Sequence, residues 1–164
     1  MRILVTAASK HGATAEIAAR IGDSLQGAGF KCEVCDVGDA PDLSGYQAVV
    51  LGSGVYAGQW LKDARRFIDE NAAALLAMPV WIFSSGPLGD PLQPDDEEAV
   101  NADSILEATG ANEHRLFAGA LDKSKLSFGE RAIVKAVRAA DGDFRNWVAI
   151  EEWAAKIAVA LRER

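Results

Sequence analysis

The chain has 164 residues, of which 49% are hydrophobic and 25% are charged, and its formal net charge is −7. This composition is typical of a globular protein, and the length predicts one domain covering residues 1–164. The acidic balance argues against nucleic acid or an anionic membrane surface as a partner, because both attract basic patches. No apolar run approaches the roughly 18 residues of a membrane span, and Met1 leads into a predicted strand without a signal peptide, so a cytoplasmic location is expected.

The first 28 residues have the pattern of an anion-binding site. The apolar run Arg2–Ala7 predicts a buried strand, and the spacing of Ile17, Ile21 and Leu25 predicts a helix over 13–28. Between them lies a loop of small and hydroxyl-bearing residues. A helix N-terminus carries unpaired N–H groups and the positive end of the helix dipole, so such a loop favours a phosphate. We therefore expect a phosphate clamp formed by Ser9, Lys10, His11, Gly12, Ala13 and Thr14.

An ordinary helix cap is the alternative for this loop, in which Ser9 or Thr14 only pairs with the first turn of the helix. The clamp is favoured, because one cap does not need two hydroxyls with Gly12 between them. His11 is expected either to donate to the phosphate or, as is commoner for a lone histidine in a loop, to be solvated. His114, at the start of a predicted strand, is expected to be solvated as well.

The rest of the chain alternates predicted strands with predicted helices. Four further strands are expected at Lys31–Asp36, Gln47–Leu51, Pro79–Ser84 and His114–Leu121. Helices are expected at Leu61–Ala77, from the acidic run Asp95–Glu98 to about Ala108, at Gly129–Ala140, and along the apolar stripe from Ile150 to Leu161. The charged residues between Lys123 and Arg131 are expected to be solvated surface. Strands that are apolar on both faces and alternate with helices indicate an α/β fold, with a parallel sheet covered by helices on both sides.

The two cysteines form a C-x-x-C sequence that invites a redox or metal hypothesis. Cys32 and Cys35 lie in a predicted strand, where residues three apart point to opposite faces. A redox pair needs its first thiol near a helix N-terminus, and a zinc site needs further ligands. Buried free thiols are therefore expected.

Two more loops of small residues, at 52–60 and 85–91, also follow predicted strands. In a parallel sheet all three loops meet at the carboxyl edge, where doubly wound sheets bind their ligands. The first loop lacks both the dinucleotide fingerprint G-x-G-x-x-G and the Walker Gly-Lys-Ser/Thr, because Gly12 is followed by Ala13 and Thr14. A response-regulator receiver would need acidic residues after the first strand and an aspartate after the third, where this chain has Ala7-Ala8-Ser9 and Gly52-Ser53.

On these residues the chain resembles the flavodoxins. Ser9-x-x-Gly12-x-Thr14 resembles the family's FMN-phosphate loop, T/S-x-T-G-x-T, with His11 at its central hydroxyl position. Within the family, the chain is similar to the flavodoxin-like, quinone-linked protoporphyrinogen dehydrogenases of haem synthesis. The shared features are Gly52-Ser53-x-Val55-Tyr56-x-Gly58, Phe117-Ala118-Gly119-Ala120-Leu121, and Asp143-x-Arg145 before Trp153. The resemblance implies a five-stranded parallel sheet of order 2-1-3-4-5 in three α/β/α layers, with FMN as the cofactor.

The resemblance also implies which residues hold the isoalloxazine ring. Tyr56 would stack on the ring, whereas Trp60 is equally well explained as a stacking residue or as packing for the following helix. Gly54 and Gly58 would let main-chain groups approach the ring edge, although loop glycines also simply form turns. The set implied for the ring and ribityl chain is Ser53, Gly54, Val55, Tyr56, Ala57, Gly58, Trp60, Ser85, Gly86, Pro87 and Gly89. No metal-ligand set, nucleophile or general base is identified.

Two functions are consistent with this pattern. The first is an FMN-dependent oxidoreductase that takes electrons from a small organic donor, with a porphyrinogen as the leading expectation, and passes them to a quinone or another acceptor. The second is an electron-transfer protein that works between protein partners, which an acidic surface would suit through electrostatic steering. A flavodoxin-like domain that has lost FMN is a third possibility. Substrate, acceptor and oligomeric state stay open.

Overall fold

A parallel sheet forms the centre of the computed structural model, which describes residues 1–86, 100, 102–136 and 141–164. Its main strands are β1 (Arg2–Ala8), β2 (Lys31–Asp36), β3 (Ala48–Tyr56), β5 (Val80–Gly86) and β6 (His114–Ala118). They pair in parallel in the order β2-β1-β3-β5-β6. This is the predicted order 2-1-3-4-5, because the predicted fourth and fifth strands are β5 and β6. The predicted α/β fold class is confirmed.

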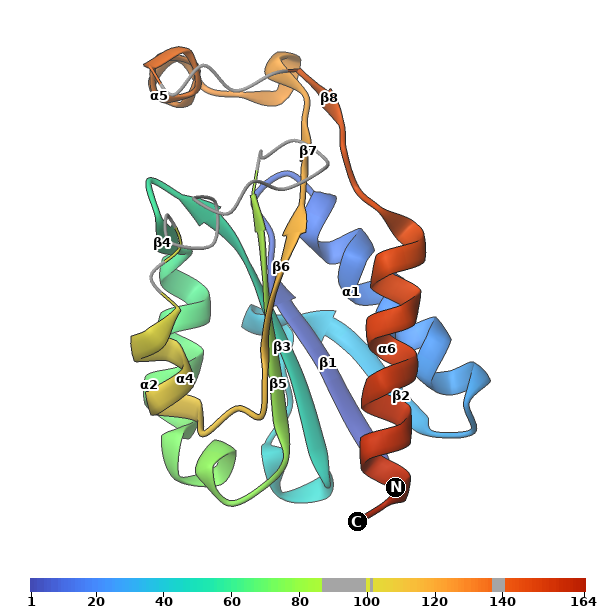
Figure 1. The fold of residues 1–164 in the computed structure, drawn as a ribbon. Helices are drawn as coiled ribbons and strands as arrows, with labels where there is room; N and C mark the ends of the chain where they lie inside the picture. Colours follow the sequence, from blue (N-terminus) through green and yellow to red (C-terminus); the bar gives the residue numbers. More distant parts are fainter. Residues whose placement is uncertain (87–99, 101, 137–140) are drawn as a thin grey trace.

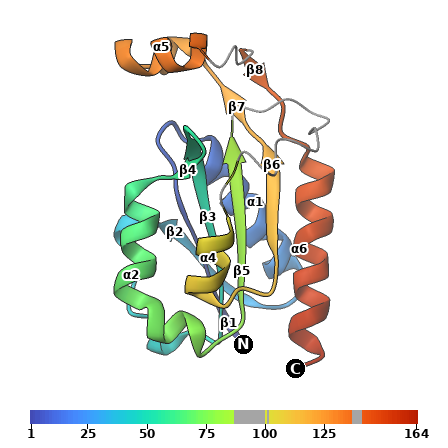
Figure 2. The ribbon, with the colours of Figure 1, turned by 60° about the vertical axis from the view of Figure 1, so that its left-hand side comes forward.

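Helices cover both faces of the sheet (Figure 1). On one face lie α1 (Ala13–Gly27) and α6 (Trp147–Arg162), and on the other lie α2 (Lys62–Leu76) and α4 (Asp103–Thr109). Figure 2 shows the same three layers after a 60° turn. Short 3₁₀ helices occur at Val37–Asp39, Leu43–Gly45 and Lys123–Lys125. The acidic run at 95–98 lies outside the described residues.

Each face of the sheet packs its own hydrophobic core. The core under α1 and α6 is anchored by three aromatic rings, Phe83, Phe117 and Trp153, whose centroids lie 5.6 to 6.1 Å apart. The Phe83 ring lies so close to β3 that a Cβ on Gly52 would approach it to 2.1 Å. Only glycine therefore fits there without moving the ring. β1 and β3 are buried on both faces through this region, as their apolar sequences predict.

The two cysteines lie on opposite faces of β2, as the strand pattern predicts. Cys32 packs against the core under α1 and α6, and Cys35 packs against the core under α2 and α4. Both are free thiols, but they are half-buried rather than fully buried. Burial raises the pKa of the Cys32 thiol to about 11 and also raises that of Cys35.

The segment after β3 differs from the predicted irregular loop. β3 continues to Tyr56 and pairs antiparallel with a two-residue strand, β4 (Gln59–Trp60). The turn between them has positive φ at both central residues, 49° at Ala57 and 73° at Gly58. That conformation suits a two-residue hairpin turn, whose twist matches the strands it connects. The predicted loop is therefore largely a β-hairpin.

The predicted strand 114–121 is broken at Gly119. Its last two residues form β7 (Ala120–Leu121), which pairs antiparallel with β8 (Gly142–Asp143) away from the main sheet. A Cβ on Gly119 would lie 2.1 Å from the Gly86 carbonyl oxygen, so the chain bends there against β5. Between β7 and β8 lies α5 (Phe128–Ala136), and residues 137–140 of the predicted helix are outside the described part.

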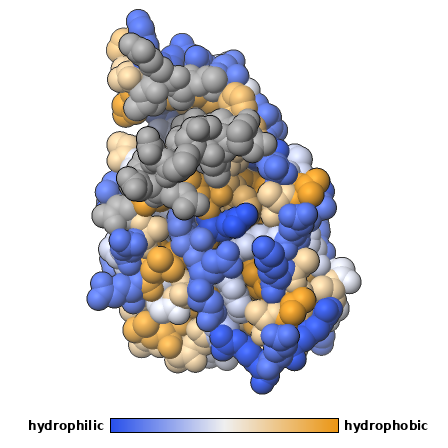
Figure 3. Space-filling view, viewed as in Figure 1, coloured by the Kyte–Doolittle hydropathy of each residue, from blue (hydrophilic) through white to orange (hydrophobic). Residues whose placement is uncertain are grey.

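We call residues 120–136 and 141–143 the extension. In Figures 1 and 2, α5 lies beyond the carboxyl ends of the strands, at the opposite end of the molecule from both termini. On the face drawn in Figure 3, hydrophilic residues surround several separate hydrophobic patches. Among the described residues, none of the helices is both long enough and apolar enough to cross a membrane.

Candidate functional site

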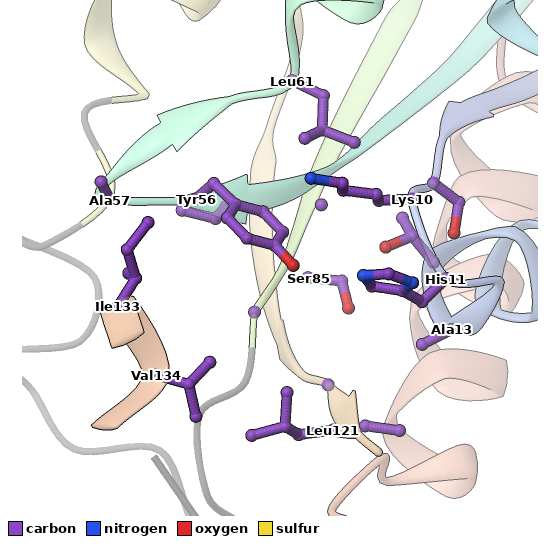
Figure 4. Close-up of a pocket in the computed structure, with 17 residues that line it drawn as sticks. Lys10, His11, Ala13, Tyr56, Ala57, Leu61, Ser85, Leu121, Ile133 and Val134 are labelled. Carbon is purple, nitrogen blue, oxygen red and sulfur yellow. The ribbon is translucent and has the colours of Figure 1, made fainter. Parts of the chain in front are cut away.

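A cavity of about 110 Å³ lies at the carboxyl edge of the sheet, where the phosphate loop, the β3–β4 hairpin and the extension meet (Figure 4). Most residues predicted for the site line it: Ser9, Lys10, His11, Ala13, Thr14, Gly54, Val55, Tyr56, Ala57, Ser85 and Gly86. Pro87 and Gly89 lie outside the described residues. Gly12, Ser53, Gly58 and Trp60 do not line the cavity.

The loop 9–14, expected to bind a phosphate, turns at Gly12. Gly12 adopts a φ of 93°, and it precedes the first residue of α1 without a side-chain cap. The Ser9 hydroxyl accepts a hydrogen bond from the Gly12 N–H at 3.1 Å. Thr14 is 5% exposed, and its hydroxyl lies beside the backbone of Gly54. Ser9 thus shapes the loop locally, and the first turn of α1 lies at the cavity, since Ala13 and Thr14 line it.

The other side of the cavity is apolar. Figure 4 shows the Tyr56 ring between Leu61, Ile133 and Val134, with Leu121 across the opening. Sequence reasoning missed all four aliphatic residues, because each belongs to an apolar helix or strand pattern that equally predicts core packing. Ile133 and Val134 come from α5, which only the folded chain brings to this edge.

Two predicted ring-binding residues have other roles in the structure. Trp60 is 3% exposed, and its indole N–H donates to the Ser84 hydroxyl at 2.7 Å. The same hydroxyl lies 2.8 Å from His114 Nε2, so His114 is bonded and not merely solvated. The Ser53 hydroxyl donates to the Gly54 carbonyl and accepts from the Leu61 N–H, which fixes the hairpin. Trp60 is packing for the core rather than a stacking surface in this structure.

The largest surprise of the site is Glu130 in α5, which lies in the segment expected to be solvated surface. The residue is 6% exposed. Its Oε1 atom lies 2.6 Å from Lys10 Nζ and 3.0 Å from His11 Nε2. The same oxygen accepts a hydrogen bond from the Tyr56 hydroxyl at 3.0 Å. Its Oε2 atom accepts the Ser127 N–H at 2.7 Å. The expectation for the segment was therefore wrong at Glu130, and His11 is bonded to a carboxylate.

These contacts shift the ionisation of the cluster. Lys10, the Ser127 amide and His11 hold the pKa of the Glu130 carboxyl far below its usual range, against the opposing effect of burial. Burial and the bond to Glu130 raise the pKa of Tyr56 to about 12. Lys10 Nζ also lies 5.1 Å from the centroid of the Tyr56 ring. The cluster therefore contains an ionised carboxylate and a neutral phenol at physiological pH.

Arg145 ties the extension to the start of α1. Its guanidinium pairs with Asp143 in β8 at 2.6 Å, with Glu16 in α1, and with the Ala13 carbonyl oxygen at 3.3 Å. It also lies 4.6 Å from the Trp147 ring centroid. The sequence feature Asp143-x-Arg145 thus corresponds to a structural brace beside the phosphate loop.

The arrangement can bind a ligand with one anionic end and one flat apolar part. Lys10 and the α1 N-terminus supply positive charge, and together with His11 they supply hydrogen-bond groups for the anion. Tyr56, Ile133 and Val134 supply an apolar wall of the kind that aromatic ligand rings contact. Gly54 lets β3 lie close to Thr14, since a Cβ on Gly54 would lie 3.3 Å from the Thr14 hydroxyl oxygen. A flavin mononucleotide has both of these parts.

Comparison with known proteins points to one family. A family model described as "Flavodoxin domain" matches residues 4–146. Protoporphyrinogen IX dehydrogenase [quinone] of Escherichia coli strain K12 is 27% identical over 86 residues, which cover 51% of this chain and 48% of that protein. The chain thus matches about half the length of this curated relative.

Solved flavodoxins share the fold over nearly the whole chain. A flavodoxin from the domain Archaea superposes with a TM-score of 0.63 at 17% identity, covering 99% of each chain. The Streptococcus pneumoniae TIGR4 flavodoxin gives a TM-score of 0.64 at 16% identity, covering 98% of this chain and 99% of the other. At these identities the superpositions establish the fold alone.

Proposed function

Because this chain belongs to the flavodoxin family, we propose that its carboxyl-edge cavity binds FMN and that the protein transfers electrons through the bound flavin. The observation that carries the proposal is the meeting of an anion-binding loop and an apolar wall in one cavity. The flavin supplies the hydride and electron chemistry when bound. The chain supplies binding, orientation and the electrostatic surroundings.

The residues divide between the two ends of the cofactor. The phosphate is assigned to the first-turn N–H groups of α1 and to the side chains of Ser9, Lys10, His11 and Thr14. The ring is assigned to Tyr56 and the aliphatic residues around it, with main-chain groups of the hairpin and of the β5 end at its edge. Ser53 and Trp60 support this edge from behind rather than through contact. Pro87 and Gly89 remain proposed ligands of the ring.

The finer proposal is an FMN-dependent oxidoreductase acting on a small organic donor with a quinone or other acceptor. The similarity to a quinone-linked protoporphyrinogen IX dehydrogenase supports it, and a porphyrinogen-like donor is the first substrate to test. An electron-transfer protein between protein partners is the second candidate. The net charge of −7 favours that candidate through long-range steering of a basic partner.

Cofactor binding is tested by the absorption and fluorescence spectra of the purified protein, recorded again after addition of FMN and desalting. We expect wild type to retain the flavin and Thr14→Val and Lys10→Gln to lose most of it, because each removes a group assigned to the phosphate. Lys62→Gln, an exposed position at the start of α2, is the matched control and should behave as wild type. A wild-type protein that retains no flavin would overturn the proposal.

Turnover separates the two candidate functions. Purified flavin-loaded protein is mixed with protoporphyrinogen and a soluble quinone, without any reductase, and flavin reduction and quinone consumption are followed. Multiple turnovers would support the oxidoreductase. A flavin that is reduced only when a protein reductase is added would support the electron-transfer protein instead.

A further inference from the structure

The Glu130 carboxylate occupies the positive side of the proposed phosphate site. Lys10 and His11 both contact it, and both come from the loop assigned to the phosphate. Of the side chains that face it, Tyr56 comes from β3, and Lys10 and His11 come from the loop before α1. A carboxylate and a phosphate compete for the same donors, because both are anionic oxygen acceptors.

The cavity under α5 is also narrow, and a second hollow of about 360 Å³ shares His11, Ala13, Ala120 and Leu121 with it. Its volume of about 110 Å³ is well below the roughly 300–1,000 Å³ of pockets that hold drug-sized ligands. Two of the side chains that narrow it, Ile133 and Val134, belong to the same helix as Glu130. A movement of α5 away from the hairpin would widen the space that a flat ring can occupy.

We propose that α5 is a lid that Glu130 holds shut on the cavity, and that the anionic end of the ligand opens it by taking over Lys10 and His11. This inference rests on the proposed function for the identity of the ligand. The lid and the ligand phosphate then exclude each other at Lys10 and His11. Only molecules with an open lid bind the ligand, so the apparent Kd is the intrinsic Kd divided by the fraction of molecules in which the lid is open.

The attachment of α5 allows such a movement. Phe128, the first residue of the helix, is 92% exposed, and Ile133 is 44% exposed. The chain enters the extension at the bend of Gly119 and returns through β8, where Arg145 braces Asp143 against α1. β7 and β8 share a ladder of only two residue pairs. The extension can thus move about its narrow base while the main sheet stays intact.

The first test removes the charge of the latch. In flavin-free protein, Glu130→Gln should increase hydrogen exchange of the α5 amides, because a neutral amide no longer pairs with Lys10. Glu107→Gln, an exposed carboxyl on α4, is the matched control and should leave α5 unchanged. Inorganic phosphate added to wild type should increase exchange in α5 as well. Unchanged exchange in Glu130→Gln would overturn the lid.

The second test measures binding of FMN and riboflavin by fluorescence. If Glu130 holds the lid closed, Glu130→Gln should lower the apparent Kd for FMN about fivefold, the scale of one partly exposed ion pair. The apparent Kd for riboflavin, which lacks the phosphate, should fall by a similar factor, because both ligands need the open lid. Weaker FMN binding by the variant would overturn the lid and make Glu130 a support for Lys10. Failure of both proteins to bind any flavin would instead overturn the proposed function, while the exchange result still decides the lid.

Discussion

The two tyrosines of this chain are each bonded to a carboxylate through their hydroxyl group. Tyr46 donates to Glu33 at 2.6 Å, and Tyr56 donates to Glu130 at 3.0 Å. In each case burial raises the pKa of the phenol, and the bond to the carboxylate raises it further, to about 12. Both bonds require a neutral phenol, because a tyrosinate beside a carboxylate would repel it.

We expect a spectrophotometric titration at 295 nm to show almost no tyrosinate at pH 10, the ordinary pKa of the side chain. Ionisation should occur near pH 12 or on unfolding. Since the folded-state pKa lies above the unfolded value, the stabilisation is complete below pH 10 and is lost as the pH rises toward 12. Glu130→Gln should lower the pKa of Tyr56 alone, and Glu33→Gln that of Tyr46 alone. A normal titration of both tyrosines would contradict the contacts.

At the scale of elements, the turn of the β3–β4 hairpin has a backbone conformation that is unfavourable for the residue in it. Ala57 has a φ of 49°, and it is the only non-glycine residue with positive φ in the described part of the chain. An L-residue with a Cβ pays roughly 1–2 kcal/mol in this region, whereas asparagine tolerates it through local hydrogen bonds. This residue also lies at the site, since Ala57 lines the cavity.

Ala57→Asn should therefore raise the free energy of unfolding of the flavin-free protein, by about 0.5–1 kcal/mol. Urea denaturation followed by tryptophan fluorescence measures it. Ala57→Val is the opposing control, which should lower stability because a β-branched side chain is strained at positive φ. If asparagine destabilises the protein and valine does not, the turn conformation is different from the one described.

The elements that the sequence predicts correctly are those whose signals are local. β1 and β5 contain short apolar runs, Ile3–Val5 and Val80–Phe83, and α1 and α2 begin and end within one or two residues of the predicted bounds. The bend at Gly119 was missed, because it depends on the carbonyl of Gly86 in another strand. The hairpin was missed because β4 is two residues long and forms only against the end of β3.

The same division holds for the site. The turn at Gly12 could be predicted, because it depends on neighbouring residues, whereas phosphate binding by the loop from Ser9 to Thr14 stays a prediction. Glu130 could not, since it meets His11 across 119 residues of sequence, and its own surroundings are charged. The family predicted from the residues is confirmed, whereas ligand contacts remain predictions.

For the whole molecule, the structure predicts a gradient of stability from the sheet to the extension. β1, β3 and β5 are buried along most of their lengths, and α5 is held by the contacts of Glu130 and by Val134, which packs with Leu121 and Leu126. Hydrogen exchange of the native protein should be slowest in the three strands and fastest in β7, α5 and β8, because local opening needs little free energy where few apolar contacts are lost. Mass spectrometry of peptic fragments measures this order. Equal protection of α5 and β3 would contradict it.

Both ends of the chain lie at the amino edge of the sheet, opposite α5 (Figure 1). A protein tethered to an electrode through either end would therefore hold its proposed flavin away from the electrode surface. The seven residues of β1 alone span roughly 23 Å of that path. Direct electron transfer between the electrode and the flavin would be slow in this orientation, because the rate of electron tunnelling falls steeply with distance. An attachment at the Ala57–Gly58 turn would instead bring the cavity rim to the conductor and leave the termini free for a soluble partner.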